Sequence, residues 1–160
     1  MILLLAPSFN NFTNTPLFIT MNILSVFREK VLALLDADRI SNRQEVNEKL
    51  VELATFFYKI DGRISLPEQA YMEELLNSLE WNSTTPVETF QNECIARINQ
   101  LKLSDSAIVS SYLTELMTRL EELEAIDQAT TIAKEISDAD GEIADDEVRY
   151  LEVVRSYRSN

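Results

Sequence analysis

Carboxylates beside the chain's two glycines are the side chains best placed to do chemistry. Each glycine follows an aspartate and is followed six residues later by a glutamate; the triplets are Asp61, Gly62 and Glu68, and Asp140, Gly141 and Glu147. Carboxylate oxygens are the ligands that hard cations such as Ca²⁺ prefer. The spacing Asp-Gly-x-Ile-x-x-x-Glu is also that of the second half of a calcium-binding EF-hand loop.

The first half of an EF-hand loop is missing from both copies. Its first ligand position falls on Phe57 and Ile136, and its third on Lys59 and Asp138. Apolar side chains and a lysine cannot ligate calcium, so a true EF-hand is excluded. A weaker carboxylate site for a divalent cation (Ca²⁺, Mg²⁺ or Mn²⁺) is still possible. It is favoured at the second copy, where several acidic residues lie close together within residues 138–147. The candidate metal ligands are Asp61, Glu68, Asp138, Asp140 and Glu147.

The same motif also has a purely structural interpretation, in which no ion binds. Gly62 and Gly141 would take the left-handed conformation that ends a helix. Glu68 and Glu147 would complement the free N–H groups at the start of the next helix. The remaining motif side chains would pack between the helices or in the core; they are Ile64, Ile143, Tyr71 and Tyr150. This interpretation does not require the two aspartates.

The motif belongs to an internal repeat. Residues 61–73 match residues 140–152 at a constant offset of 79, and upstream Leu53-Ala54 aligns with Ile132-Ala133. Self-similarity at a fixed offset indicates repeated architecture. We therefore expect a duplicated helix–loop–helix.

Composition restricts the function classes. The 160 residues carry a net charge of −13, which argues against a nucleic-acid partner and is compatible with hard cations or a basic protein. The chain has no histidine and one cysteine, Cys94, which excludes Ser-His-Asp and Cys-His catalysis, thiolate zinc clusters and an intrachain disulfide. We expect no enzymatic activity; a carboxylate-metal hydrolase is kept as the least favoured alternative.

We expect neither a signal peptide nor a membrane span in the first residues. Residues 1–5 are apolar, but the run is short and has no basic start. We expect a cytoplasmic protein with no direct membrane insertion. Met21 is a plausible natural start, so we divide the chain into an N-terminal arm, 1–20, and a helical domain, 21–160.

Helical patterns fill the rest of the chain, and we find no convincing strand. We predict an all-α, single-domain bundle of about seven helices, built from two pseudo-repeated halves joined by a connecting helix. Expected caps are Ser65 with Glu68, Thr85 with Pro86, and Ser104. The predicted helices cover about 22–37, 42–60, 66–80, 86–100, 105–123, 125–139 and 145–157.

Two of these helices have clear apolar faces. In 42–60 the predicted buried residues are Val46, Leu50, Leu53, Phe57 and Ile60. In 105–123 apolar residues step by four and three, as in a coiled-coil seam; they are Val109, Leu113, Leu116, Leu120 and Leu123. We expect this second face to lie in the core of the bundle, with a dimer seam as the alternative.

On these residues the sequence resembles the TerB family of bacterial tellurite-resistance proteins. The likeness covers roughly residues 25–158 and is carried by Leu53-Ala54 through Glu68 and by Ile132-Ala133 through Glu147. It implies a compact helical bundle with a non-enzymatic role in resistance to tellurite and other chemical stress. It also implies metal binding through acidic residues, of which only Asp61, Glu68, Asp140 and Glu147 carry over by motif.

The resemblance also suggests partners. They would be other proteins of the resistance system, some of them membrane-associated or calcium-binding, and a homodimer is a further option. Leu66 and Pro67 stand where the family often has acidic residues, which makes the first copy the poorer cation site. The main alternative to a cation-responsive module is a structural adaptor or homodimer with no ion site.

Overall fold

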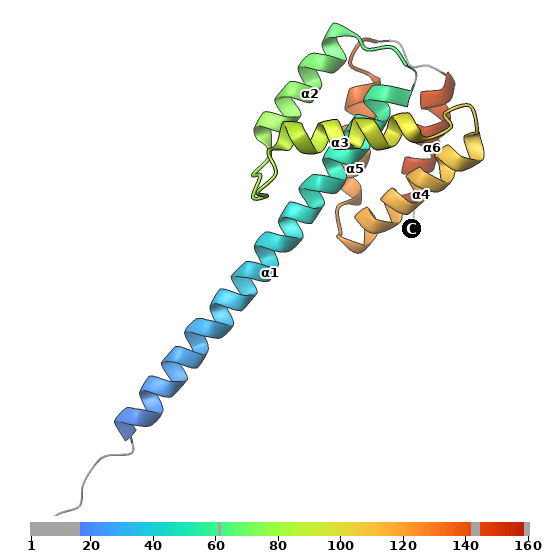
Figure 1. The fold of residues 1–160 in the computed structure, drawn as a ribbon. Helices are drawn as coiled ribbons and strands as arrows, with labels where there is room; N and C mark the ends of the chain where they lie inside the picture. Colours follow the sequence, from blue (N-terminus) through green and yellow to red (C-terminus); the bar gives the residue numbers. More distant parts are fainter. Residues whose placement is uncertain (1–16, 61, 142–144, 159–160) are drawn as a thin grey trace, which may run out of the picture. The chain divides into compact units, whose positions relative to one another are not determined.

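The computed structural model describes residues 17–60, 62–141 and 145–158 (Figure 1). Asp61 and Ile143 lie outside this set. The described residues form helices and no strand, which confirms the all-α class. The helices are α1 (Leu17–Ile60), α2 (Leu66–Ser78), α3 (Val87–Gln100), α4 (Ser106–Glu122), α5 (Ile126–Ser137) and α6 (Asp145–Arg158).

The chain divides into two units, Met1–Asp38 and Arg39–Asn160. The described part of the first unit is a single stretch of helix, the beginning of α1. The second unit contains the rest of α1 and the other five described helices. Every site considered below lies in this second unit.

One helix replaces the two that we predicted for 22–37 and 42–60. α1 continues through the segment between them, so the described residues form six helices and not about seven. This segment contains neither glycine nor proline, the residues that interrupt helices most strongly. Ser41 and Asn42 can cap a helix, but they are also tolerated inside one. The division into two three-helix halves remains a pattern of the sequence.

The C-terminal half of α1 is the centre of the second unit. All eight residues from Leu50 to Phe57 are buried, with at most 6% of any residue exposed. Our predicted face contained only part of this set and missed Val51 and Phe56. Where a helix is covered on every side, the alternation of apolar and polar residues does not reveal all of its buried positions.

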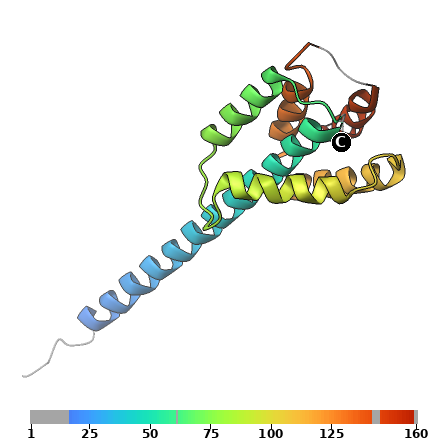
Figure 2. The same ribbon diagram turned by 45° about the horizontal axis from the view of Figure 1, so that its top comes forward.

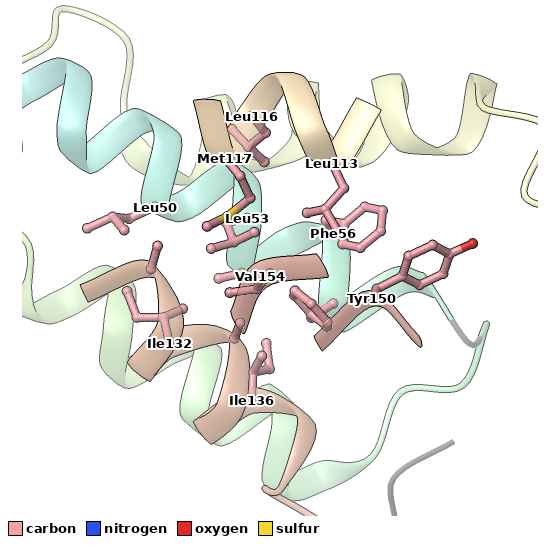
Figure 3. Packing of buried hydrophobic residues seen from close by; sticks show 14 of the residues in the cluster. Leu50, Leu53, Phe56, Leu113, Leu116, Met117, Ile132, Ile136, Tyr150 and Val154 are labelled. Atoms are coloured by element: carbon pink, nitrogen blue, oxygen red, sulfur yellow. The ribbon is translucent and has the colours of Figure 1, made fainter. Parts of the chain in front are cut away.

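Side chains from α4, α5 and α6 pack against this central helix. Figure 3 shows Leu50, Leu53 and Phe56 of α1 among them. Tyr150 and Phe56 meet edge to face, with 5.5 Å between ring centroids. The other labelled members of the cluster are Leu113, Leu116, Met117, Ile132, Ile136 and Val154.

The apolar face of α4 lies in this core, as we expected. Val109, Leu113 and Leu120 are fully buried and Leu116 is 4% exposed. These four positions of the predicted coiled-coil seam are therefore buried in the core of the chain itself.

The helix caps agree with the sequence at one site and differ at two. Ser65 forms the predicted capping box with Glu68 at the start of α2. The cap of α4 is Asp105 and not Ser104, because the Asp105 carboxylate accepts hydrogen bonds from the N–H groups of Ala107 and Ile108. At α3 the N-cap is Pro86, which makes no side-chain hydrogen bond, so the predicted cap there is also wrong.

Candidate functional site

Both motif glycines adopt the left-handed backbone conformation. The φ angle is 71° at Gly62 and 79° at Gly141. No atom lies within 4 Å of the position that a Cβ would occupy at either residue. There is therefore room for a side chain at both positions. The positive φ angle alone explains why glycine occupies them.

Glu68 serves the start of α2. It is 6% exposed, and its Oε2 atom accepts a hydrogen bond from the Ser65 backbone N–H at 2.7 Å. In return, the Glu68 N–H donates to the Ser65 hydroxyl oxygen at 3.2 Å. One carboxylate oxygen is therefore used by the chain itself, which explains Glu68 without an ion.

The acidic residues of the second copy are in different environments. Glu147 is the third residue of α6, as Glu68 is of α2, and it is 3% exposed. Asp138, which ends α5, and Asp140 are both exposed. Within residues 17–60, 62–141 and 145–158, no three acidic or cysteine side chains gather closely enough to hold a metal ion. Asp61 lies outside those ranges.

The isoleucine of the first copy does not pack between the helices, so that prediction is wrong for Ile64. Its side chain is 48% exposed, and Leu66 two residues later is 82% exposed. The three residues between Gly62 and Leu66 are exposed or half-buried, so this segment does not bring Ile64 inward. The result is a pair of exposed apolar side chains at the first loop, which we call the loop-one apolar pair.

The two motif tyrosines differ: Tyr150 lies in the core, as predicted, whereas Tyr71 is half-buried and bonds to a neighbouring helix. Tyr150 is 2% exposed and belongs to the core. The Tyr71 hydroxyl donates to Glu135 on α5 at 2.9 Å. Burial, and then the bond to Glu135, raise the pKa of Tyr71 well above its usual value. Tyr71 therefore fastens α2 to α5.

A buried polar cluster around Glu52 was missed by the sequence analysis. Its carboxylate accepts hydrogen bonds from the Tyr112 hydroxyl at 2.7 Å and from Lys49 at 2.9 Å, and Arg97 lies 3.6 Å away. Glu52 is 6% exposed. The available signal was a single charged residue inside the apolar run Leu50–Phe57, since buried charges require partners.

Cys94 adjoins this cluster and is fully buried. The Arg97 guanidinium donates to its sulfur at 3.2 Å. Burial raises the pKa of the Cys94 thiol to about 11, although Arg97 partly opposes that shift. Little thiolate forms at neutral pH, so Cys94 is not an activated nucleophile.

Two surface grooves lie beside α1. One, of about 600 Å³, has an apolar floor of Val46, Leu50, Leu79 and Ile132. The other, of about 560 Å³, runs past Glu52 and Tyr112 and is lined mainly by charged side chains of α1 and α4. In this second groove Arg119 pairs with Glu45 and Glu122, each at 2.6 Å.

Comparison with protein-family models, curated proteins and solved structures found no match to this chain. The TerB-like interpretation therefore stands on the motif alone. None of the helices in the described part of the chain is both long and apolar enough to cross a membrane.

Proposed function

We propose that the chain is a non-catalytic, TerB-like module of a tellurite or chemical-stress resistance system, and that it acts by binding other proteins. The observation that carries the proposal is the loop-one apolar pair. Leu66 is 82% exposed, the highest value among the exposed large apolar side chains of the described residues. Covering such apolar side chains with a partner removes them from water, which favours association.

The position of this pair supports a role for the motif itself in binding. Ile64 and Leu66 lie inside the repeated motif, Ile64 on the loop after Gly62 and Leu66 at the first position of α2, next to the Ser65–Glu68 capping box. A rigid loop loses little conformational freedom on binding, which favours recognition. We propose that the first copy of the motif serves to present the apolar pair.

The alternative, a structural adaptor without an ion site, gains support from one specific observation. The capping box already uses a Glu68 oxygen that a cation would need. We therefore propose that the motif glutamates punctuate helices, and that cation binding is not required for function. Substitution of the exposed Asp138 or Asp140 at the second copy distinguishes a module that binds a cation from one that does not.

Genetic complementation in the native host tests the proposed function. Deletion of the gene should sensitise cells to tellurite, and the wild-type gene should restore growth. A Leu66→Ser gene should fail to restore it, although the variant protein should melt at the wild-type temperature because Leu66 buries little surface. The matched control is Ile108→Ser, which removes a 40% exposed apolar side chain from α4 and should complement. A deletion strain with wild-type resistance would contradict the proposal.

A further inference from the structure

α3 is attached to the rest of its unit by few side chains. Only Cys94 and Ile98 of its 14 residues are buried, one helical turn apart. For comparison, five of the 17 residues of α4 are buried. Figures 1 and 2 both show α3 lying across the C-terminal half of α1. Elements with few buried apolar contacts open locally more readily than the rest of a protein.

A single buried carboxylate supplies the polar attachment of α3. Arg97 of α3 lies 3.6 Å from Glu52 of α1, and its guanidinium also donates to Cys94 within α3. The Glu52 side chain is 8% exposed, whereas that of Arg97 is 46% exposed. Arg97 can therefore return to solvent easily, and the buried Glu52 then keeps Lys49 and Tyr112 as partners.

The segment before α3 is held to α1, because the Asn47 amide donates to the Glu80 carbonyl oxygen at 2.9 Å and the Asn82 N–H donates to Gln44 at 2.7 Å. Phe90, in the first turn of α3, packs on Trp81 of that segment, with 5.4 Å between ring centroids. On opening, α3 would therefore swing about this fixed segment.

The N-cap of α3, Pro86, makes no side-chain hydrogen bond. Irregular segments of several residues join it to α2 and to α4. The main core cluster contains Ile98 as the one residue of α3, so most of that cluster would be unaffected by the loss of this helix.

We propose that α3 is a releasable helix: it opens from α1 as a unit while the core stays folded, and the Glu52–Arg97 ion pair is the latch. Opening uncovers Cys94 and the side of α1 that carries Glu52. This conformational device is independent of the proposed function, because it involves neither the repeated motif nor the loop-one apolar pair.

Thiol labelling of the full-length protein tests the proposal directly. Cys94 is the chain's one cysteine, so the rate of its reaction with Ellman's reagent measures its exposure. We expect labelling at low urea to be nearly independent of urea concentration, because opening α3 exposes much less surface than global unfolding. Glu52→Gln should accelerate labelling up to about fivefold, since an ion pair with a partly exposed arginine contributes up to about 1 kcal/mol. The fold-increase in labelling rate should exceed the fold-increase that Glu52→Gln causes in the equilibrium constant for global unfolding, which is measured in parallel.

The matched control is Glu45→Gln, which lies in the same groove but pairs with Arg119 of α4 and not with α3. It should leave the labelling rate nearly unchanged. If Glu52→Gln fails to fold, Arg97→Gln carries the test, because Arg97 is partly exposed and its removal leaves Glu52 with two partners. Labelling that shows the urea dependence of global unfolding would overturn the proposal. Equal acceleration by the Glu45 and Glu52 variants would also overturn it.

Discussion

At the scale of single residues, backbone conformation explains the two motif glycines and helix capping explains Glu68. Gly62 and Gly141 have φ angles that side chains disfavour, and Glu68 closes a capping box. The sequence predicted the glycine conformation and the first capping box correctly, because both depend on local geometry. It could not predict the exposure of Ile64, because burial depends on what the rest of the chain brings alongside.

Replacing either glycine should destabilise the protein through the backbone alone. Gly62→Ala and Gly141→Ala should each cost about 1 kcal/mol in urea unfolding, because a Cβ disfavours the left-handed conformation. There is room for the added methyl group at both sites. If either variant were as stable as the wild type, the glycine would not be needed for helix termination.

The capping role of Glu68 predicts a loss of stability that does not depend on any ion. Glu68→Ala should lower the free energy of unfolding by about 1 kcal/mol, in EDTA as well as in buffer with Ca²⁺. Glu74→Ala, an exposed change on the same helix, is the control and should have little effect. A loss seen with Ca²⁺ but absent in EDTA would instead identify Glu68 as a cation ligand.

The buried thiol of Cys94 predicts a fall in stability at alkaline pH. Its folded-state pKa is raised to about 11, whereas an unfolded cysteine titrates near about 8.5. The unfolded chain therefore loses its proton first, so the thiol's contribution to stability is intact below about pH 8.5 and is lost as pH rises towards 11. Cys94→Ala should flatten the pH dependence of unfolding between about pH 8.5 and 10, below the range in which tyrosines titrate. An unchanged slope in that variant would contradict this assignment.

At the scale of helices, local patterns located most elements but not their limits. The predicted helices from residue 66 onward correspond to α2 to α6, with ends that shift by a few residues. The break expected after residue 37 is absent, because capping residues permit a helix end without requiring one. The neighbouring Ser104 and Asp105 show the same ambiguity, since both are good caps and the sequence does not say which the helix uses.

A pair of substitutions distinguishes these two caps. Asp105→Ala should destabilise the protein by about 1 kcal/mol, because two N–H groups at the start of α4 lose their acceptor. Ser104→Ala should be nearly neutral in the same chemical unfolding experiment. Equal costs, or a larger cost at Ser104, would place the start of α4 one residue earlier.

At the scale of the whole molecule, the second unit is organised around one buried helix segment, Leu50–Phe57. The apolar face of 42–60 identified the helix, but not that Leu50–Phe57 is covered on every side, because burial of the other positions depends on the tertiary fold. The Glu52 cluster was missed for the same reason. Besides Lys49 on α1, its partners are Arg97 of α3 and Tyr112 of α4, which are far away in sequence and which only the tertiary fold brings to Glu52.

The central position of α1 also bears on function. The core around α1, with the buried Glu52 cluster, supports the surface of the second unit. The loop-one apolar pair and the exposed Asp138 and Asp140 lie on that surface. Our account assigns recognition to the apolar pair and helix punctuation to the motif glycines and glutamates. The aspartates are where a cation-responsive mechanism would have to act.

Thermal unfolding of the full-length protein in EDTA, and then with Ca²⁺, Mg²⁺ or Mn²⁺, tests this account most directly. A specific ion at 100 times its Kd would add about 2.7 kcal/mol of stability, an easily measured shift in melting temperature. Asp140→Asn is the test variant, and Glu121→Gln, an exposed change on α4, is its control. The account predicts no saturable, ion-selective shift in any of the three proteins. A saturable shift with one ion that is lost in Asp140→Asn and kept in Glu121→Gln would contradict it.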